Sequence, residues 1–325
     1  MVSVTGLWGL TFIIIWFASV VNWVWEQGFR WPQIRLGMGI YAGIMAVVLL
    51  LGGARLVFFP SVSGTIRVGS VTASQTIVIQ LRKCLENEDW KCVRRTSDQL
   101  FTVLIEDSQQ AARAGANIVF WQEYAARVLH SDEQAFIERG RELARQENIY
   151  LGMVLFTMTR AYPDEFGENK VIWIAPSGEV IAEYLKSRPV PGETCIAGEG
   201  NIPVFHSPYS KIASVICYDM DFPGFVRRAG QAGADLMLVP ARDWKEVNLL
   251  HSQMAVFRAI ENGFSLVRST DQGVSVACDY QGQILARLDQ LTTKERFMIA
   301  DIPIRGVTTI YSRIGVLFAC PNRTA

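Results

Sequence analysis

Three side chains that could act together in covalent catalysis each follow a separate apolar run of the sequence. Glu123, Lys186 and Cys217 stand directly after or close to the ends of these runs. A carboxylate near a thiol can act as a general base and generate the nucleophilic thiolate. A lysine beside them would lower the thiol pKa and stabilise the oxyanion of a tetrahedral intermediate, with the N–H of Tyr218 as a second donor. The trio therefore predicts nucleophilic catalysis by Cys217.

The elements expected to position these side chains are buried strands. The runs at 117–121, 179–185 and 212–216 have the length and apolar content of such strands. If the three strands are neighbours, all three side chains converge at one edge of a sheet, where open α/β sheets place their sites. A helix predicted at 225–232 follows the cysteine, and its N-terminal N–H groups would favour the thiolate.

The three histidines stand in no comparable position. We interpret His130, His206 and His251 as surface or core-packing residues, since none follows a strand in the way that the trio does. This interpretation argues against a protease of the Cys–His type.

The composition argues against a nucleic-acid-binding protein and against a zinc protein. The 325 residues carry 31 Lys and Arg against 31 Asp and Glu, and no basic stripe that would indicate a nucleic-acid partner. The six cysteines include no CxxC pair, which argues against a zinc site, and we expect no metal and no cofactor. The sequence leaves undecided whether Cys84 and Cys92 form a disulfide, because this depends on whether the segment faces an oxidising compartment.

Two apolar stretches at the start of the chain predict membrane helices, at about 7–25 and 36–59. The first carries no charge and nearly matches the ~20 residues that span a bilayer. A cleaved signal peptide fits poorly, because residues 1–6 carry no positive charge and two apolar runs follow. The loop at 26–35 holds Arg30 and Arg35 against Glu26, which favours a cytoplasmic loop and an outer position for the following domain.

The remainder of the chain is predicted to form one α/β domain. We predict a membrane segment at 1–59, a linker at 60–64, a domain at 65–317 and a tail at 318–325. Strands and helices alternate first and hairpins follow, including one at 170–185, which favours helices packed outside a sheet core.

The motifs in this domain resemble the nitrilase, or carbon–nitrogen hydrolase, superfamily, and within it the apolipoprotein N-acyltransferases. The resemblance covers about 65–317. The motifs that carry it are WQE at 121–123, YLKSRPVPGE at 184–193, CYD with FP at 217–223, GADLMLVPARDW at 233–244, MAVFRAIENG at 254–263, VRSTDQGVSVACDYQGQIL at 267–285 and TTIYSRIG at 308–315.

The resemblance implies a four-layer αββα sandwich behind two membrane helices, with a catalytic triad. Glu123 matches the family's base, Lys186 its oxyanion-stabilising lysine and Cys217 its nucleophile. Glu193 matches an additional active-site acid. The two residues after the nucleophile match supporting positions of the family: Tyr218, and Asp219 where glutamate is usual.

The resemblance also implies the reaction. Cysteine takes a fatty acyl group from a phospholipid as a thioester, and the N-terminal amine of a lipoprotein accepts it. The implied location is a multi-pass protein of the inner cell membrane with its domain on the outer, periplasmic side. The relatives usually carry more membrane helices, so we expect a partial or diverged member.

Two other functions are open at this stage. The same triad could use water as acceptor, giving a membrane-anchored amidase or nitrilase-like hydrolase. A catalytically inactive, membrane-tethered binding module is the third candidate, against which the intact trio argues. A lid over the site is expected at 196–201 or at 242–248.

Overall fold

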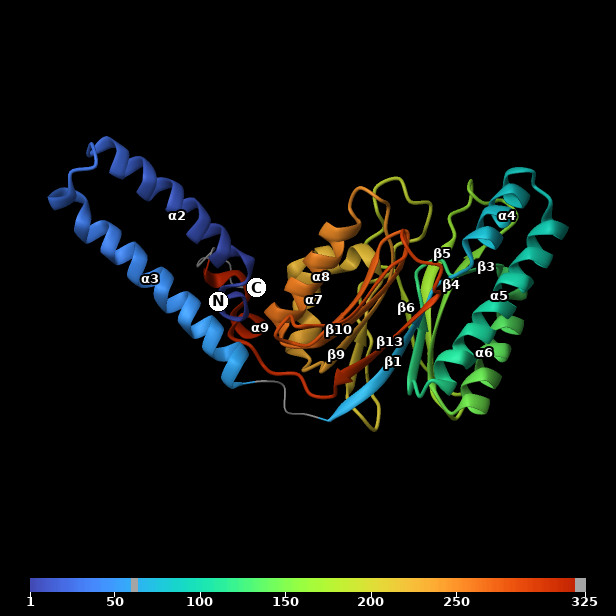
Figure 1. Cartoon of the computed structure of the whole chain (residues 1–325). Helices are drawn as coiled ribbons and strands as arrows, with labels where there is room; N and C mark the ends of the chain where they lie inside the picture. Colours follow the sequence, from blue (N-terminus) through green and yellow to red (C-terminus); the bar gives the residue numbers. More distant parts are fainter. Residues whose placement is uncertain (60–63, 319–325) are drawn as a thin grey trace.

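The computed structural model describes residues 1–59 and 64–318. Two sheets face each other, and helices cover the outer face of each, so the domain has four layers in the order helix, sheet, sheet, helix (Figure 1). The predicted αββα architecture is confirmed. The predicted linker at 60–64, apart from Gly64, and the tail at 318–325, apart from Phe318, lie outside the described residues.

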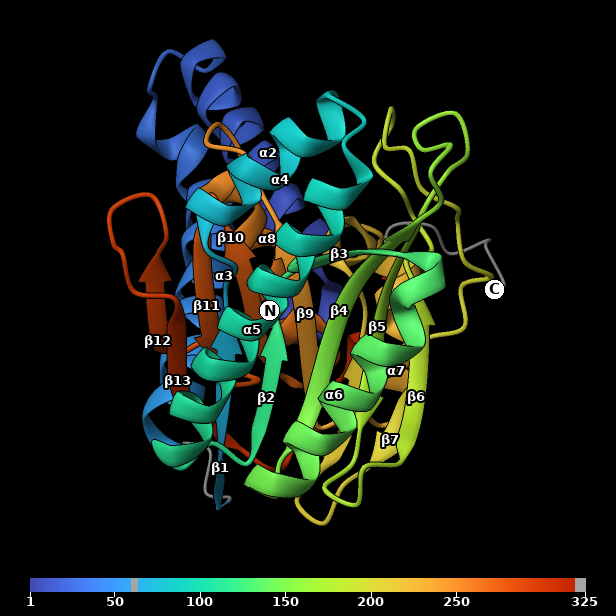
Figure 2. The same ribbon diagram turned by 90° about the vertical axis from the view of Figure 1, so that its right-hand side faces the viewer.

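The first sheet has parallel strands at its centre and antiparallel strands at its edges (Figure 2). In spatial order its strands are β13 (Phe297–Pro303), β1 (Thr65–Val71), β2 (Ile118–Trp121), β4 (Tyr150–Met158), β5 (Glu168–Ile174) and β6 (Val180–Leu185), with β3 (Ala126–Leu129) paired to β4. The predicted hairpin at 170–185 is thus β5 and β6.

The second sheet repeats this plan. Its spatial order is β12 (Ile284–Asp289), β11 (Val274–Cys278), β10 (Ser265–Asp271), β9 (Leu236–Arg242), β8 (Lys211–Ser214) and β7 (Val204–His206). Side chains from the facing sheets pack against each other, as Trp173 of β5 and Phe205 of β7 do at 5.3 Å between ring centroids. This interface forms the core of the domain, as in other face-to-face sheets.

Parallel neighbours require crossover connections, and here these are helices. Those on the first sheet are α5 (Trp90–Arg113) and α6 (Glu133–Glu147), and those on the second are α7 (Pro223–Gln231) and α8 (Asn248–Asn262). A further helix, α4 (Gln75–Glu86), packs on α5, and a disulfide joins Cys84 to Cys92 at this junction. The Cys84–Cys92 disulfide, which the sequence left undecided, is therefore present in the structure.

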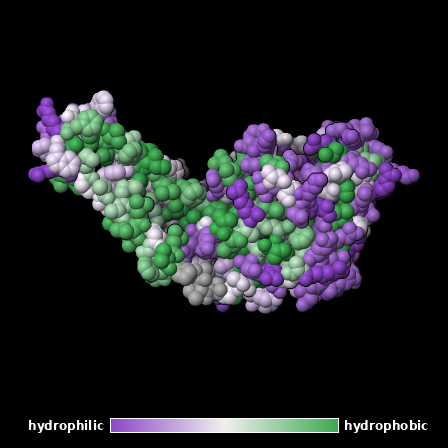
Figure 3. All heavy atoms as spheres, in the orientation of Figure 1, coloured by the Kyte–Doolittle hydropathy of each residue, from purple (hydrophilic) through white to green (hydrophobic). Residues whose placement is uncertain are grey.

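The chain begins with a helical hairpin that projects away from the sandwich (Figure 1). Its arms are α2 (Leu7–Glu26) and α3 (Trp31–Phe58), and both are long and apolar enough to cross a membrane. Their surface is predominantly apolar, whereas that of the sandwich is largely polar (Figure 3). The second helix starts earlier than the predicted residue 36, because Pro32 suits the first turn of a helix. The expected loop at 26–35 shrinks accordingly.

The hairpin is attached to the sandwich at the start of α2. The short helix α1 (Val2–Thr5) packs on α8 and on α9 (Ile310–Ile314). The first N–H of α2, on Leu7, donates to Oε1 of the buried Glu261 at 2.9 Å. Gly6 approaches Tyr311 so closely that an added Cβ would lie 2.5 Å from its ring. The apolar hairpin thus meets the same helix, α8, that lines the back of the site described next.

Candidate active site

The predicted trio lies together on the wall of one pocket of about 410 Å³. The strands that carry it are not neighbours in one sheet, however. Glu123 and Lys186 follow β2 and β6 of the first sheet, whereas Cys217 follows β8 of the second. The expectation of a single sheet edge is therefore wrong. The side chains meet across the interface between the sheets, where the ends of both sets of strands come together.

Lys186 occupies the centre of a charged cluster. Its Nζ lies 2.7 Å from Oε1 of Glu123 and 2.8 Å from Oε2 of Glu193, and its side chain is only 1% exposed. Burial acts to lower the pKa of this lysine, but the neighbouring carboxylates, Glu123 first, reverse the effect and raise the pKa well above its usual range. The ammonium group is therefore permanently charged and fixed in position by two acids.

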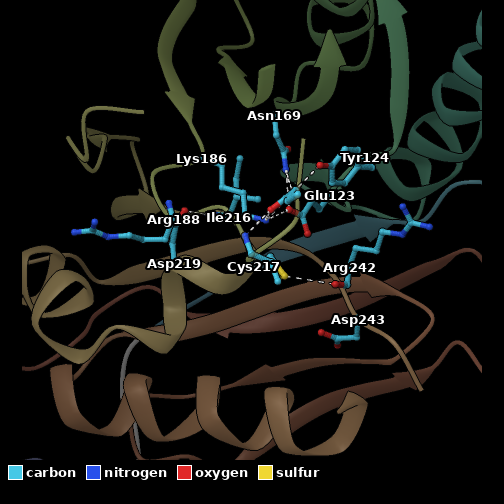
Figure 4. Close-up of polar contacts among 12 residues, drawn as sticks. Glu123, Tyr124, Asn169, Lys186, Arg188, Ile216, Cys217, Asp219, Arg242 and Asp243 are labelled. Carbon is cyan, nitrogen blue, oxygen red and sulfur yellow. Dashed lines mark hydrogen bonds and ion pairs between the residues drawn. The ribbon is translucent and has the colours of Figure 1, made fainter. Parts of the chain in front are cut away.

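Glu123 is oriented by hydrogen bonds to one of its two oxygens. Oε1 accepts from Asn169 Nδ2 at 2.8 Å and from Lys186 Nζ at 2.7 Å (Figure 4). Among the described residues, Oε2 accepts no hydrogen bond, so it is the oxygen available to a proton on the pocket side. The backbone N–H of Glu123 also donates to Ala241 O in the second sheet, at 3.3 Å, which links the two sheets at the site.

Asn169 escaped the sequence analysis. It lies near the start of β5 and is fully buried, with its amide directed at the carboxylate of Glu123. Its signal in the sequence is weak: asparagine is depleted in strands, so one that opens an apolar run calls for a polar partner.

Glu193 is the second acid that faces Lys186, as the family resemblance implied. Its carboxylate also accepts from Tyr124 Oη at 2.6 Å and from the backbone N–H of Val190 at 2.8 Å. Burial acts to raise the pKa of Glu193, but attraction to Lys186 outweighs it and the pKa is lowered. Glu193 is thus held as a carboxylate, and it lies beside Glu123, since the amide of Asn169 donates to both carboxylates, at 2.8 Å to Glu123 and 3.4 Å to Glu193.

Cys217 begins a short 3₁₀ helix, η2 (Cys217–Asp221), directly ahead of α7. Its φ is 47°, in the left-handed region that side chains seldom adopt. Its Sγ donates to Arg242 O at 3.5 Å (Figure 4). Such strain is typical of residues held for function by their surroundings.

The thiol of Cys217 is buried, and burial followed by the Glu123 carboxylate raises its pKa well above the ordinary value. Lys186 and Arg268 act in the opposite direction but do not prevail. The expected lowering of the thiol pKa by lysine is therefore wrong for the net effect. A raised pKa favours the neutral thiol, and a neutral thiol would need a base in order to react as a nucleophile.

Asp219 joins the turn that carries Cys217 to the loop that follows Lys186. Its carboxylate accepts from the N–H of Ile216 at 3.1 Å, from the N–H of Arg188 at 2.7 Å and from Tyr184 Oη at 2.8 Å. Tyr218, the other supporting candidate, directs its ring at Phe222, with 5.1 Å between centroids. Its side chain is not part of the pocket wall.

His251 corrects the sequence analysis, which treated all three histidines as unrelated to the site. It lies on α8, with Nδ1 2.8 Å from Asp243 Oδ1 and Nε2 2.8 Å from Asp221 Oδ2. Arg268 donates two further bonds to Asp243, each of 2.7 Å. Burial acts to lower the pKa of His251, but the two carboxylates raise it to about 9. This ion-pair network supports the floor of the site behind Cys217.

Two groups of potential metal ligands are found in the described part of the chain. The ligand atoms of Cys217, Asp243 and His251 lie within 4.8 Å of one another. Arg268 already donates to both oxygens of Asp243, and the two ring nitrogens of His251 are paired with Asp243 and Asp221. The second group, His130, Glu133 and Glu168, surrounds the ammonium of Lys170, at 2.6 and 2.8 Å from the two glutamates. Both groups are ion-pair networks in this structure.

One of the two predicted lid segments, 242–248, contributes residues to the pocket wall. Arg242, Asp243 and Trp244, which begin the segment 242–248, line the pocket, while no residue of 196–201 does so. Trp244 is 46% exposed. The segment at 242–248 is therefore the one in a position to cover the site.

Comparison with known proteins agrees with this geometry. The sequence profile described as "Carbon-nitrogen hydrolase" matches residues 67–311. This range includes every residue of the site described above.

Curated relatives include apolipoprotein N-acyltransferases. That of Shewanella oneidensis is 28% identical over 232 residues, which are 62% of this chain and 44% of the relative. That of Rickettsia typhi is 23% identical over 337 residues, covering 96% of this chain and 64% of the relative. The chain thus spans about half to two thirds of the length of these proteins. A probable hydrolase of Schizosaccharomyces pombe is 24% identical over 64% of this chain and 87% of its own length.

Solved structures confirm the fold. An amidase from Nesterenkonia sp. superposes with a TM-score of 0.57 at 21% identity, covering 78% of this chain and 95% of the amidase.

Proposed function

The chain belongs to the carbon–nitrogen hydrolase family, and we propose that it works in a membrane as an N-acyltransferase. In this proposal, Cys217 takes a fatty acyl group from a phospholipid and passes it to the N-terminal amine of a lipoprotein. The observation that carries the proposal is the joint presence of a Glu–Lys–Cys pocket and two long apolar helices in one chain. The Rickettsia typhi acyltransferase aligns with 96% of the chain, so the similarity includes the helices.

The first half-reaction forms a thioester. Glu123 accepts the thiol proton of Cys217 as Sγ attacks the ester carbonyl of the phospholipid. The ammonium of Lys186 and the N–H of Tyr218 stabilise the oxyanion of the tetrahedral intermediate. The intermediate collapses, the carbon–oxygen bond to glycerol breaks, and Glu123 returns the proton to the departing alkoxide. The products are the acyl-enzyme and a lysophospholipid.

The second half-reaction transfers the acyl group. The uncharged amine of the acceptor attacks the thioester carbonyl, and Glu123 accepts a proton from its nitrogen. The same two donors stabilise the oxyanion, the carbon–sulfur bond breaks, and the proton returns to Cys217. An amide and the free thiol result, so one base serves both directions of proton transfer.

We also propose that the domain lies on the outer side of the inner membrane. Arg30, next to the turn between α2 and α3, and Arg35, in the first turns of α3, favour a cytoplasmic position for that turn. Both ends of the hairpin then face outward. The disulfide between Cys84 and Cys92 supports this side, because disulfides persist in oxidising compartments.

The competing function is hydrolysis, with water in place of the amine. The two are separated by offering the acyl-enzyme a diacylated lipopeptide with a free N-terminal cysteine amine, and its N-acetylated counterpart as control. Transfer of the acyl group to the free amine alone supports the acyltransferase. Release of free fatty acid at equal rates with both peptides would assign the chain to the hydrolases.

A further inference from the structure

Two arginines line the pocket beside Tyr124. Arg127 lies on β3 and Arg242 at the end of β9, and both belong to the pocket wall. Both guanidinium groups lie over the ring of Tyr124, at 5.5 and 5.8 Å from its centroid. In Figure 4 the side chain of Arg242 extends to the same side of the site as Tyr124. Two cations from different sheets are therefore gathered around one aromatic ring.

In the described part of the chain, acids do not pair with both of these cations. Arg127 forms no ion pair there, and its Nε is buried without a hydrogen-bond partner. The described residues give Arg242 one ion pair, with Asp271, at 3.7 Å between Nε and Oδ2. That oxygen also accepts a hydrogen bond from Gln75 Nε2 at 3.1 Å. One carboxylate, Asp271, thus faces two guanidinium groups, and this group of three side chains carries a net positive charge.

Burial and a neighbouring cation both make the charge of Arg127 unfavourable. Burial, followed by repulsion from Arg242, lowers its pKa to about 10. The group remains charged at neutral pH, but at a cost in free energy that a bound anion would remove. Guanidinium groups bind phosphate and carboxylate in a planar, bidentate manner.

The same part of the pocket has an apolar wall. It is formed by four side chains: Leu85, Phe156, Met158 and Tyr162. A free inorganic anion would leave these groups without contacts. A ligand with an anionic head and a hydrocarbon portion fits both walls, as in other pockets where a few polar groups fix orientation.

We propose that Arg127 and Arg242 form a subsite for the phosphate of the acyl donor, placing its hydrocarbon portion against the apolar wall. This proposal rests on the proposed function, since it assigns the substrate of the same pocket. A carboxylate could occupy the same position by the same chemistry. A phosphate that carries a hydrocarbon chain contacts both the two arginines and the apolar wall. The subsite thereby determines which acyl donors bind.

The test is protection of Cys217 from iodoacetamide in the detergent-solubilised full chain, measured by peptide mass mapping. Octyl phosphate should slow alkylation, while octanol and inorganic phosphate at equal concentration should not. Substituting Arg127→Gln should weaken the apparent affinity for octyl phosphate on the order of tenfold, the value of one charged hydrogen-bonding partner. Arg242→Gln should weaken it similarly. Each rate is compared with that of the same variant without ligand.

Arg113→Gln provides the matched control, because Arg113 is exposed at the end of α5 and is not part of the pocket wall. Its affinity for octyl phosphate should equal that of the wild type. Equal protection by octanol, or unchanged protection in both arginine variants, would overturn the subsite. Equal protection by inorganic phosphate would overturn the assignment to an amphiphile, and stronger protection by octanoate would replace phosphate by carboxylate.

Failure of the proposed function would have a different signature. If phospholipid vesicles leave no acyl group on Cys217 while octyl phosphate still protects the thiol through Arg127, the subsite stands and the acyltransferase assignment falls.

Discussion

The ammonium of Lys186 lies 2.7 Å from the carboxylate of Glu123, although 63 residues separate them in the chain. In the proposed mechanism, this pair orients the base, and it places a permanent positive charge beside the carbonyl that is to be attacked. Because both side chains are buried, the attraction is only weakly screened by solvent. The predictions below follow from this arrangement.

Replacing Lys186 by Met should impair acylation more than folding. The two carboxylates of Glu123 and Glu193 would then face each other without a cation, which we expect to cost about 3 kcal/mol of unfolding free energy. Loss of the oxyanion donor should reduce acyl-enzyme formation by about 100- to 1000-fold. Single-turnover acylation and denaturant unfolding measure the two effects. Lys91→Met, at an exposed site on α5, is the control, and normal acylation in Lys186→Met would remove the lysine from the mechanism.

Replacing Glu123 by Gln should speed alkylation of the Cys217 thiol but slow acyl transfer. The carboxylate raises the pKa of Cys217, so its removal should lower this pKa and speed alkylation by iodoacetamide at any fixed pH. Without a base, acyl transfer should fall by at least about 100-fold. Alkylation rates between pH 6 and pH 10 measure the first effect. Slower alkylation in the variant would contradict the electrostatic account.

The wild-type thiol should itself show no plateau near neutral pH. Because burial raises the pKa of Cys217 well above its ordinary value, the alkylation rate should keep rising with pH through pH 9. A plateau below pH 8 would indicate a thiolate in the resting site. In that case Glu123 would not be needed as a base.

Asp219→Asn should disturb the position of the nucleophile. The carboxylate accepts hydrogen bonds from Ile216, Arg188 and Tyr184, and an amide oxygen cannot serve all three. We expect kcat/KM to fall about 10- to 100-fold, with the loss in kcat, because the cysteine is misplaced within the bound complex. Tyr184→Phe removes one of these donors and should have a smaller effect. A change confined to KM would contradict a positioning role.

His251 makes stability depend on pH. Its pKa rises from 6.5 to about 9 in the folded chain, so the charged ring stabilises the fold. This contribution is complete below pH 6.5 and is lost as pH rises through about 9, and its upper limit is roughly 3 kcal/mol. Unfolding free energies from pH 6 to pH 10 should therefore fall in the wild type and fall less in His251→Gln. Parallel curves would show that the ring is uncharged.

The sequence analysis identified residues of the pocket better than it identified their arrangement. Glu123, Lys186 and Cys217 could be found because each follows an apolar strand and carries local motifs. Their meeting across two sheets could not, because strand pairing depends on contacts between residues far apart in the chain. The assumption that the strands were neighbours in one sheet was the natural one, and it was wrong.

Residues without a local motif were missed for the same reason. Asn169 and His251 have roles only because of their partners, which stand 46 residues away in one case and 8 and 30 residues away in the other. An isolated histidine in a helix carries no sign that two buried carboxylates flank it. The start of α3 was missed because the helix was assigned from its apolar run at 36–59, although Pro32 favours a helix start.

The central claim is that Cys217 forms a thioester with a fatty acyl group from phospholipid. It is tested most directly by intact-protein mass spectrometry after incubation with phospholipid vesicles. Cys217→Ala and Cys217→Ser are tested beside the wild type, each shown to be folded by its thermal transition. We predict a fatty-acyl mass on the wild type that hydroxylamine removes, no adduct on the alanine variant, and little or none on the serine variant. An unmodified wild type, folded and with Cys217 open to alkylation, would contradict the claim, as would an adduct that persists in Cys217→Ala.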